Sequence, residues 1–412
     1  MSGSGRSPAA TSRDHRMWPL YAAGFTTALG AHAVAANLGA FSGGVVRSLM
    51  TLGLLLALYD GAEVVLKPVF GSLADRIGAR PVLIAGLVGF SLASATYAVA
   101  DRPGWLWAAR LGQGAAASAF SPSASALVAR LNPAAKHGRA FGSYGFYKSI
   151  GYTLGPLLGG VLVWFGGLRL MFAVLAAGSL VVAVWAAIAV PTVSPLPRTR
   201  QTVVDVAHRL SDPGFVKPTA ALAGATAALS VGVGFLPVTG AAAGLGALAT
   251  GAAVSVLAAT GALVQPRAGR ALDEGRITVA GGLTAGLLLA AGGLASAAVG
   301  GLGAVLLAAV LIGAGTGLIT PLGFAALAGA TPPARLGQTL GAAELGRELG
   351  DAGGPLLVAA VATGVTQAAG YAALAVILAA GALVMLVRGT ARERRRRDGR
   401  DEPVRTKEER HA

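Results

Sequence analysis

Apolar runs of about 20 residues recur along the whole chain and constrain its fold more than any other feature. A helix of this length crosses a hydrocarbon core of about 30 Å and satisfies its own backbone hydrogen bonds in lipid. Only 12% of the residues are charged and the mean hydropathy is +0.66, whereas a soluble protein carries about 25% charged residues. The sequence therefore predicts an all-α integral membrane protein.

Twelve such runs can be placed, and each predicts one membrane helix. They cover residues 17–40, 48–70, 80–100, 104–129, 140–165, 168–190, 217–240, 246–266, 278–299, 302–328, 338–362 and 368–388. The first run follows Arg13 and Arg16 and in that respect resembles a signal peptide. It continues to about Ala40 and similar runs follow, so we interpret it as a first membrane helix.

Basic residues are distributed unevenly between the predicted spans. The gaps after even-numbered spans contain Arg76, Arg80, Arg130, Lys136, Arg139, Arg198, Arg200, Arg209, Arg267, Arg270, Arg276 and Arg335. The gaps after odd-numbered spans contain only Arg47, Arg102 and Arg169. Because cytoplasmic loops carry the excess of Lys and Arg, both termini are expected in the cytoplasm. The excess of arginine over lysine is typical of a GC-rich bacterial genome, so we expect the bacterial inner membrane.

The net charge of +15 raises the alternative of nucleic-acid binding. Much of this charge lies in a C-terminal segment with Arg392, Arg394, Arg395, Arg396, Arg397, Arg400 and Arg405. A cluster directly after a membrane span favours anionic lipids as its partner, with RNA binding as the alternative. We therefore expect lipid rather than nucleic acid.

Cysteine is absent and the five histidines lack the spacing of metal ligands. Disulfides and thiolate chemistry are excluded, and a metal site is not expected. No combination of nucleophile and base is visible either. The sequence predicts neither an enzyme nor a bound cofactor.

Residues 191–216 form the longest polar interruption and divide the chain into two halves. The predicted organisation is a cytoplasmic tail (1–16), a six-helix bundle (17–190), a cytoplasmic linker (191–216), a second six-helix bundle (217–388) and a disordered polybasic cytoplasmic tail (389–412). Similar residues recur 198 or 199 positions apart, as in Pro19 and Pro218, Asp75 and Asp273, Lys148 and Arg347, and Gly155-Pro156 and Gly354-Pro355. This repeat predicts two parallel halves with a site between them near the midplane.

Four motifs carry a resemblance to a known family. Residues 71–80, with Gly71, Asp75, Arg76, Gly78 and Arg80, resemble the loop between spans 2 and 3 of the major facilitator superfamily, and Gly269, Asp273 and Arg276 form a degenerate copy. Arg110 and Gln113 resemble its fourth-span motif. Its fifth-span motif, found in antiporters, is similar to a stretch with Gly151, Gly155, Pro156, Gly159 and Gly160. Over nearly its whole length the chain resembles bacterial 12-span drug–proton antiporters.

The resemblance implies a fold and a mode of action. The fold would consist of twelve membrane helices in two pseudo-symmetric six-helix bundles. The function would be proton-coupled export of a small amphipathic or drug-like molecule by alternating access, driven by the proton gradient in a monomer. The Asp75 loop would latch the cytoplasmic side against the other half, with an ordinary positive-inside loop as the alternative. The glycines of the fifth span would set the direction of transport, with tight helix packing as the alternative.

Charges within the predicted spans are the main candidates for proton coupling, because each is costly in lipid without a partner. Asp60, Glu63 and Lys67 share one face of span 2, and one face of span 11 carries Glu344, Arg347, Glu348 and Asp351. The resemblance places these spans side by side. We expect Arg347 to face Asp60 or Glu63, and the carboxylates to carry the proton. The alternative is a static ion-pair network.

Other polar residues of the spans are candidates for contacts with substrate or charges. In the family, the equivalent of Arg110 has a polar or acidic partner on span 1, which here offers only His32 and Asn37. His32 either titrates or simply forms hydrogen bonds. Lys148 and Arg347 either form a symmetric pair that suits an organic anion, or Lys148 pairs with an acid of its own half.

These patterns leave alternative functions open. One is an exporter or proton symporter of an organic anion, indicated by Lys148 and Arg347. Another is a membrane receptor or scaffold that does not transport, with the polybasic tail as a binding arm. The buried charges argue against the second alternative.

Overall fold

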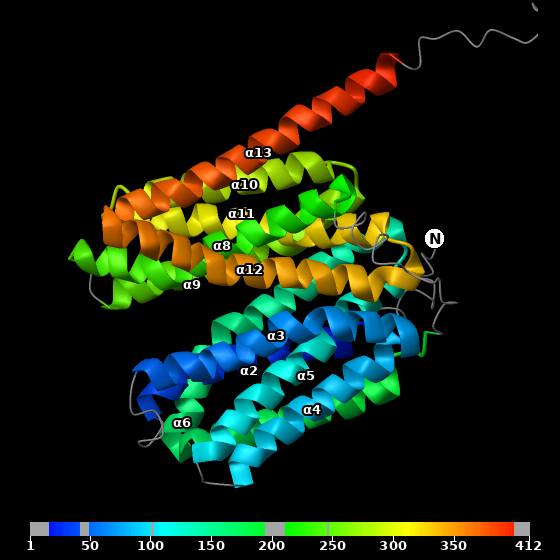
Figure 1. The fold of residues 1–412 in the computed structure, drawn as a ribbon, viewed down its shortest axis with the longest axis vertical. Helices are drawn as coiled ribbons and strands as arrows, with labels where there is room; N and C mark the ends of the chain where they lie inside the picture. The colour runs from blue at the N-terminus through cyan, green and yellow to red at the C-terminus, as the bar shows by residue number, and fades with distance from the viewer. Residues whose placement is uncertain (1–15, 42–48, 100–102, 194–210, 245–246, 399–412) are drawn as a thin grey trace, which may run out of the picture.

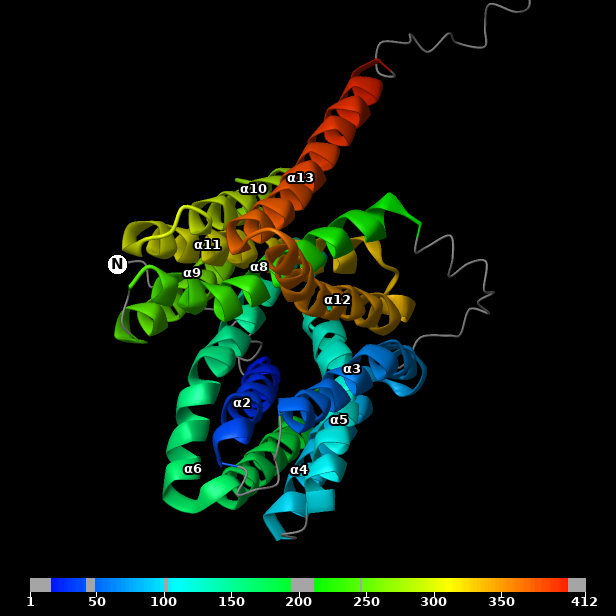
Figure 2. The same ribbon diagram turned by 60° about the vertical axis from the view of Figure 1, so that its left-hand side comes forward.

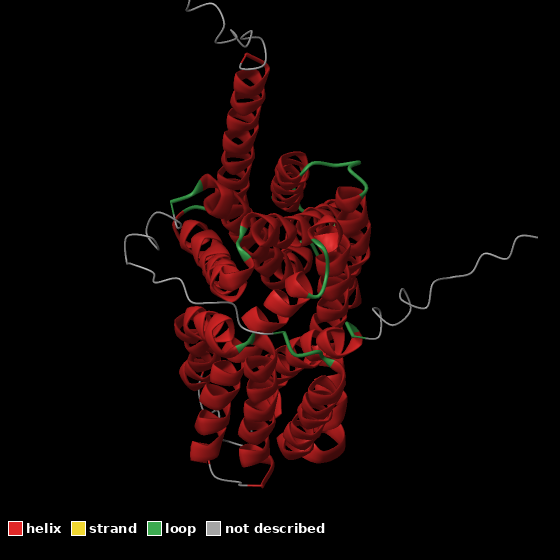
Figure 3. Ribbon diagram, turned by 90° about the vertical axis from the view of Figure 1, so that its right-hand side faces the viewer, coloured by secondary structure: helices red, strands yellow, loops and turns green. Residues whose placement is uncertain are grey.

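A computed structural model describes residues 16–41, 49–99, 103–193, 211–244 and 247–398, and all of its regular structure within these ranges is helical (Figure 3). The long helices are α2 (Trp18–Phe41), α3 (Leu49–Ile77), α4 (Ala79–Val99), α5 (Pro103–Arg130), α6 (His137–Ala189), α8 (Pro213–Ala242), α9 (Ala247–Asp273), α10 (Val279–Ala297), α11 (Leu302–Ala330), α12 (Leu336–Gly364) and α13 (Gln367–Asp398). The 3-10 turns η1 (Ala134–Lys136) and η2 (Pro333–Arg335) precede α6 and α12. The all-α prediction is confirmed.

Helix α6 contains two predicted spans in one element. Its backbone departs from helical geometry at Gly166 and Gly167, and Gly167 has a φ of 67°. Glycine adopts this left-handed conformation without a steric penalty, so the chain can bend between the spans 140–165 and 168–190. The long helices of the described residues thus account for all twelve predicted spans.

Three other helix ends follow local sequence signals. Asp212 accepts a hydrogen bond of 3.0 Å from the Gly214 N–H at the start of α8, and Pro213 follows it in the first turn. Thr278 caps α10 through the Gly281 N–H. Gly275 follows α9 with a φ of 69°, a common way for a helix to end.

Six described helices are long and apolar enough to cross a membrane on these criteria alone: α4, α6 with η1, α8, α10, α11 and α13. Helix α3, by contrast, contains Asp60, Glu63 and Lys67 within its length. Large apolar side chains such as Trp164 and Leu356 are exposed on the outside of the molecule, as expected where lipid is the solvent.

The helices form two groups, α2 to α6 and α8 to α13, which lie one above the other in Figure 1. Between the groups, α3 lies against α12 and α6 against α9, as Figure 2 also shows. The predicted neighbourhood of spans 2 and 11 is therefore present.

The predicted domain boundaries differ from the structure at two places. Helix α8 begins at Pro213, inside the predicted linker 191–216. Helix α13 continues to Asp398 and so includes part of the expected tail, 389–412. The predictions for residues 1–15, 194–210 and 399–412 lie outside the described residues.

Candidate functional site

Asp75 joins the two halves at the start of α12. Its carboxylate accepts hydrogen bonds from the backbone N–H groups of Gly337 (2.9 Å) and Gln338 (2.8 Å), and Arg130 of α5 lies 3.3 Å from it. The start of a helix has free N–H donors and a positive partial charge. Since α12 has no side-chain cap from its own N-terminal residue, a carboxylate of the other half caps it.

Asp273 forms the same contact in the opposite direction. It accepts hydrogen bonds of 2.8 Å from the N–H groups of Gly138 and Arg139 at the start of α6, which also lacks a cap of its own. The degenerate copy of the loop motif thus keeps the interaction. We call the Asp75 and Asp273 contacts the gate clamps, and the end of the molecule where they lie the gate face.

Glycines let the backbones approach at both gate clamps. A Cβ atom on Gly71 would lie 2.5 Å from the carbonyl oxygen of Gly337, and Gly269 meets the carbonyl of Gly138 in the same way. A larger residue would push the halves apart. The spaced glycines of the two loop motifs therefore have a packing reason.

The basic residues of these motifs do not form the gate clamps. Arg76 is exposed, whereas Arg80 donates to the Ala187 carbonyl near the end of α6 and to the Thr192 hydroxyl (2.8 Å) just after it. Arg276 pairs with Glu274 at the surface. Gly78 has a φ of 101° and makes the turn between α3 and α4.

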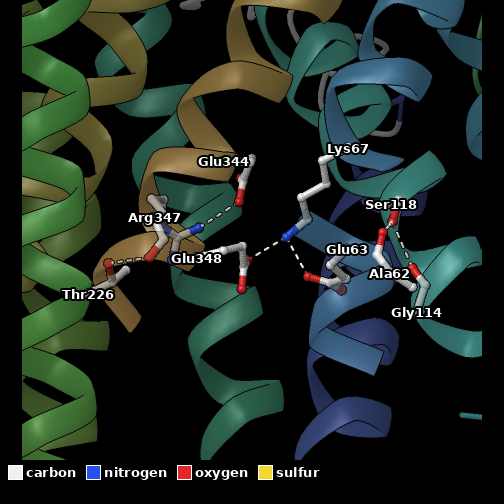
Figure 4. A network of polar contacts seen from close by, with 9 residues as sticks. All are labelled: Ala62, Glu63, Lys67, Gly114, Ser118, Thr226, Glu344, Arg347 and Glu348. Carbon is white, nitrogen blue, oxygen red and sulfur yellow. Dashed lines mark hydrogen bonds and ion pairs between the residues drawn. The ribbon is translucent and has the colours of Figure 1, made fainter. Parts of the chain in front are cut away.

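A lysine bridges the halves further from the gate face. The Lys67 ammonium lies 2.5 Å from Glu63 of its own helix and 2.5 Å from Glu348 of α12, and all three side chains are largely buried (Figure 4). The sequence predicted Arg347 as the residue facing Asp60 or Glu63. The structure shows the reverse arrangement: the cation that crosses to the other half is Lys67 of α3, and its partner there is Glu348. Arg347 pairs with Glu344 of its own helix instead.

The close contacts of Arg347 are all with residues of its own, C-terminal half. Its guanidinium donates to Glu344 at 3.0 Å, and its carbonyl accepts a hydrogen bond of 2.8 Å from Thr226 of α8 (Figure 4). Its Cζ atom lies 5.8 Å from the ring centroid of Phe324. Glu344 is only 1% exposed.

Asp60 and Asp351 extend the charged faces beyond this bridge. Both are exposed, and Asp351 accepts a hydrogen bond from Ser230 of α8. A Cβ on Gly61 or Gly353 would meet no atom within 4 Å. The halves are therefore in contact from Lys67–Glu348 to the gate face, while the faces beyond that bridge are open at these positions.

Arg110 has its partners on α3 and not on the first span. This side chain is 2% exposed; its Nε donates to the Leu55 carbonyl (3.3 Å), and its Cζ lies 4.4 Å from the Tyr59 ring centroid. Gln113 accepts from Arg110 at 3.4 Å. Tyr59 in turn hydrogen-bonds Glu63. A buried polar chain thus leads from Arg110 through Tyr59 to the ion-paired glutamate.

His32 and Lys148 meet at an aromatic ring of α6. The His32 ring lies 4.4 Å from that of Tyr152, and the Lys148 Nζ lies 5.8 Å from the same ring. Within the described residues Lys148 forms no ion pair. The carboxylate that interacts electrostatically with it is Glu344 of the other half. The hypothesis of an acid in its own half has no support here.

The glycine motif of the fifth span packs α6 against α2. A Cβ on Gly155 or Gly159 would lie within 3 Å of α2 atoms, and Gly151 meets the Phe25 carbonyl. Asn37 of α2 donates to the Pro156 carbonyl at 3.1 Å and lies next to Gly160. The motif therefore has the packing role described by the alternative interpretation.

Several contacting residues were absent from the sequence prediction: Tyr59, Tyr152, Thr226, Ser230 and Gln265, the last of which donates to Ser149 of the other half at 2.7 Å. The donors of the gate clamps were also missed. Gly138 and Gly337 are 199 positions apart, so the repeat itself could have indicated them.

The family model described as Major Facilitator Superfamily matches residues 20–298. The chain belongs to this superfamily. As a major facilitator protein it is a membrane protein of a transporter family and not an enzyme.

Its curated relatives include drug-resistance proteins. The puromycin resistance protein pur8 of Streptomyces alboniger is 41% identical over 93 residues, 22% of this chain and 18% of the relative. The quinolone resistance protein NorA of Staphylococcus aureus is 30% identical over 111 residues, 27% of this chain and 29% of the relative. The matches thus span less than a third of either relative.

Solved structures match over nearly the whole chain. A human organic anion transporter (TETRAN) has a TM-score of 0.75 at 18% identity and covers 92% of this chain and 100% of its own. FucP in its outward conformation has a TM-score of 0.76 at 15% identity, with 91% and 99% covered. At these identities the likeness shows the major facilitator fold.

Proposed function

We propose that this major facilitator protein is a proton-driven antiporter that exports a small amphipathic or drug-like molecule by alternating access. The observation that carries the proposal is Lys67, held by Glu63 of one half and Glu348 of the other. A proton on Glu348 would remove its attraction for Lys67 and weaken the link between α3 and α12. Proton uptake would then favour separation of the halves.

The proposed orientation places the gate face and both termini in the cytoplasm of a bacterial inner membrane. The loops at this face carry Arg76, Arg80, Lys136, Arg139 and Arg276, as expected for cytoplasmic loops. In this orientation the gate clamps close the cytoplasmic side. Relatives named for puromycin and quinolone resistance support a drug-like cargo. The protein would act as a monomer, with its basic C-terminal segment near anionic lipid.

The test uses inside-out vesicles with an imposed acidic lumen and two fluorescent dyes, one cationic and one anionic. Wild-type protein is expected to accumulate one of the dyes only while the gradient is present. Glu63→Gln and Glu348→Gln are each expected to abolish gradient-driven accumulation. Glu408→Gln in the C-terminal segment is the matched control.

The outcomes separate the possibilities. Accumulation that survives the collapse of the gradient would reject proton coupling. Full activity of both variants would remove Lys67 and its carboxylates from the mechanism. No movement of either dye would argue for a receptor or a carrier of narrow specificity.

A further inference from the structure

Two cations of opposite halves act on one carboxylate. Lys148 of α6 and Arg347 of α12 stand 199 positions apart, at matching places in the repeat. Glu344 pairs with Arg347 at 3.0 Å and is also attracted by Lys148. Glu344 is 1% exposed, so little water screens its attraction to either cation.

Each of the two cations has a charge or a hydrogen-bond donor that is not fully satisfied. Within the described residues Lys148 has no ion pair, and the Nε of Arg347 is buried without a hydrogen-bond partner. An unsatisfied buried donor is costly, and so is a cation in the membrane without a close anion. A second negative group would satisfy both needs.

Aromatic rings lie beside both cations. The Lys148 Nζ and the Arg347 Cζ each lie 5.8 Å from a ring centroid, that of Tyr152 and that of Phe324. The His32 ring also lies next to Tyr152, with centroids 4.4 Å apart, and His32 is itself exposed. Flat apolar groups stack favourably on such rings.

We propose that Lys148 and Arg347 bind the anionic group of an aromatic organic anion, and that Glu344 fills this site in its absence. The inference rests on the proposed function and names the substrate class of the same site. The substrate anion binds Lys148 from one half and Arg347 from the other, so its binding joins the halves. The aromatic part of the substrate lies against Tyr152 and His32.

The exposed carboxylates of Asp60 and Asp351 would favour the opposite class, an organic cation. The experiment therefore compares 2-naphthoate with 2-naphthylmethylammonium, which share a ring system and differ in charge. Binding is measured by calorimetry on the full chain in lipid nanodiscs. It requires no proton gradient, so its result is independent of whether transport is proton-coupled.

Wild-type protein is expected to bind naphthoate in preference to the ammonium compound. Lys148→Gln should weaken naphthoate binding about tenfold or more, because a charge-assisted contact is lost. Lys148→Arg should retain most of the affinity. Glu344→Gln should bind naphthoate more tightly, because the internal competitor is gone. Lys217→Gln, at the start of α8, is the matched control and should bind like wild type.

Three results would overturn the proposal. The first is preference for the ammonium compound, which would assign the site to cations. The second is equal naphthoate affinity in wild type and Lys148→Gln, and the third is no binding of naphthoate by wild type. A monodisperse elution profile of each variant excludes misfolding as the cause.

Discussion

At the scale of single residues, Lys67 has two carboxylates and needs only one for charge balance. Losing the contact to Glu348 leaves it paired with Glu63, so the halves can part without stranding a lysine in the membrane. Glu348 has no such reserve, because its ion pair within the described residues is Lys67. Separation of the halves would therefore leave Glu348 of the C-terminal half as a charge without a partner, which is energetically costly unless Glu348 gains a proton.

Tyr59 connects this ion pair to the buried Arg110. We expect Tyr59→Phe to change the pH profile of transport, because the phenol that hydrogen-bonds Glu63 is removed while the ring beneath Arg110 remains. The measurement is initial transport rate against pH in proteoliposomes. Equal pH profiles for wild type and Tyr59→Phe would contradict the connection.

The charged faces of spans 2 and 11 could be predicted from helical periodicity, but their pairing could not. Spacing of three and four residues fixes which side chains share a face. It does not fix how far each side chain reaches or which way it turns. Lys67 and Arg347 have similar length and charge, and only the packing of the helices decides that Lys67 crosses to the other half.

At the scale of helices, close approach of the backbones joins α2 to α6, besides the contacts of Tyr147 with Trp18 and Tyr21. Glycines of α6 leave room for the α2 backbone at Phe25 and Ala33, and Asn37 adds a hydrogen bond to Pro156. In lipid, such close packing is a main source of helix association.

Gly159→Val should therefore destabilise the N-terminal half by about 1–3 kcal/mol. A Cβ at this position would lie 2.7 Å from Asn37 Nδ2 and 2.8 Å from Ala33 Cβ. Gly178→Val is the control in the same helix, because a Cβ there meets no atom within 4 Å. Melting temperature in detergent is the readout, and an equal loss in both variants would show that helix propensity alone is responsible.

The order and number of spans could be predicted because each span is a separate apolar run in the sequence. The joining of two spans in α6 could not, since the break at Gly166 and Gly167 is one of many glycine pairs in this chain. Nothing local in the sequence distinguishes a pair that bends a helix from a pair that packs within one.

At the scale of the whole molecule, the two gate clamps tie each half to the other with the same chemistry. Asp75 caps α12 and Asp273 caps α6, so the internal repeat appears as a reciprocal interaction. In this structure the two halves are therefore joined at the gate face by two similar contacts, and further inside by the Lys67–Glu348 bridge.

Asp75→Asn should shift the balance between closed and open gate by about tenfold or more, because hydrogen bonds to a charged group are replaced by weaker ones. The natural absence of cysteine allows a single reporter, Gly353→Cys, on the opposite side of the bridge. Its labelling by a maleimide should slow in Asp75→Asn. Asp212→Asn, which caps only its own helix, is the control. Unchanged labelling and transport would count against the gate clamp.

In the proposed transport cycle, the caps that α6 and α12 receive from the other half would report each opening of the gate face. When the gate face opens, the amides of Gly138, Arg139, Gly337 and Gln338 lose their carboxylates and meet water. Deuterium exchange at these positions would then record how often the halves part, while the middle of each helix stays protected. A substrate that speeds turnover would speed this exchange, and an inhibitor that locks the closed gate would stop it.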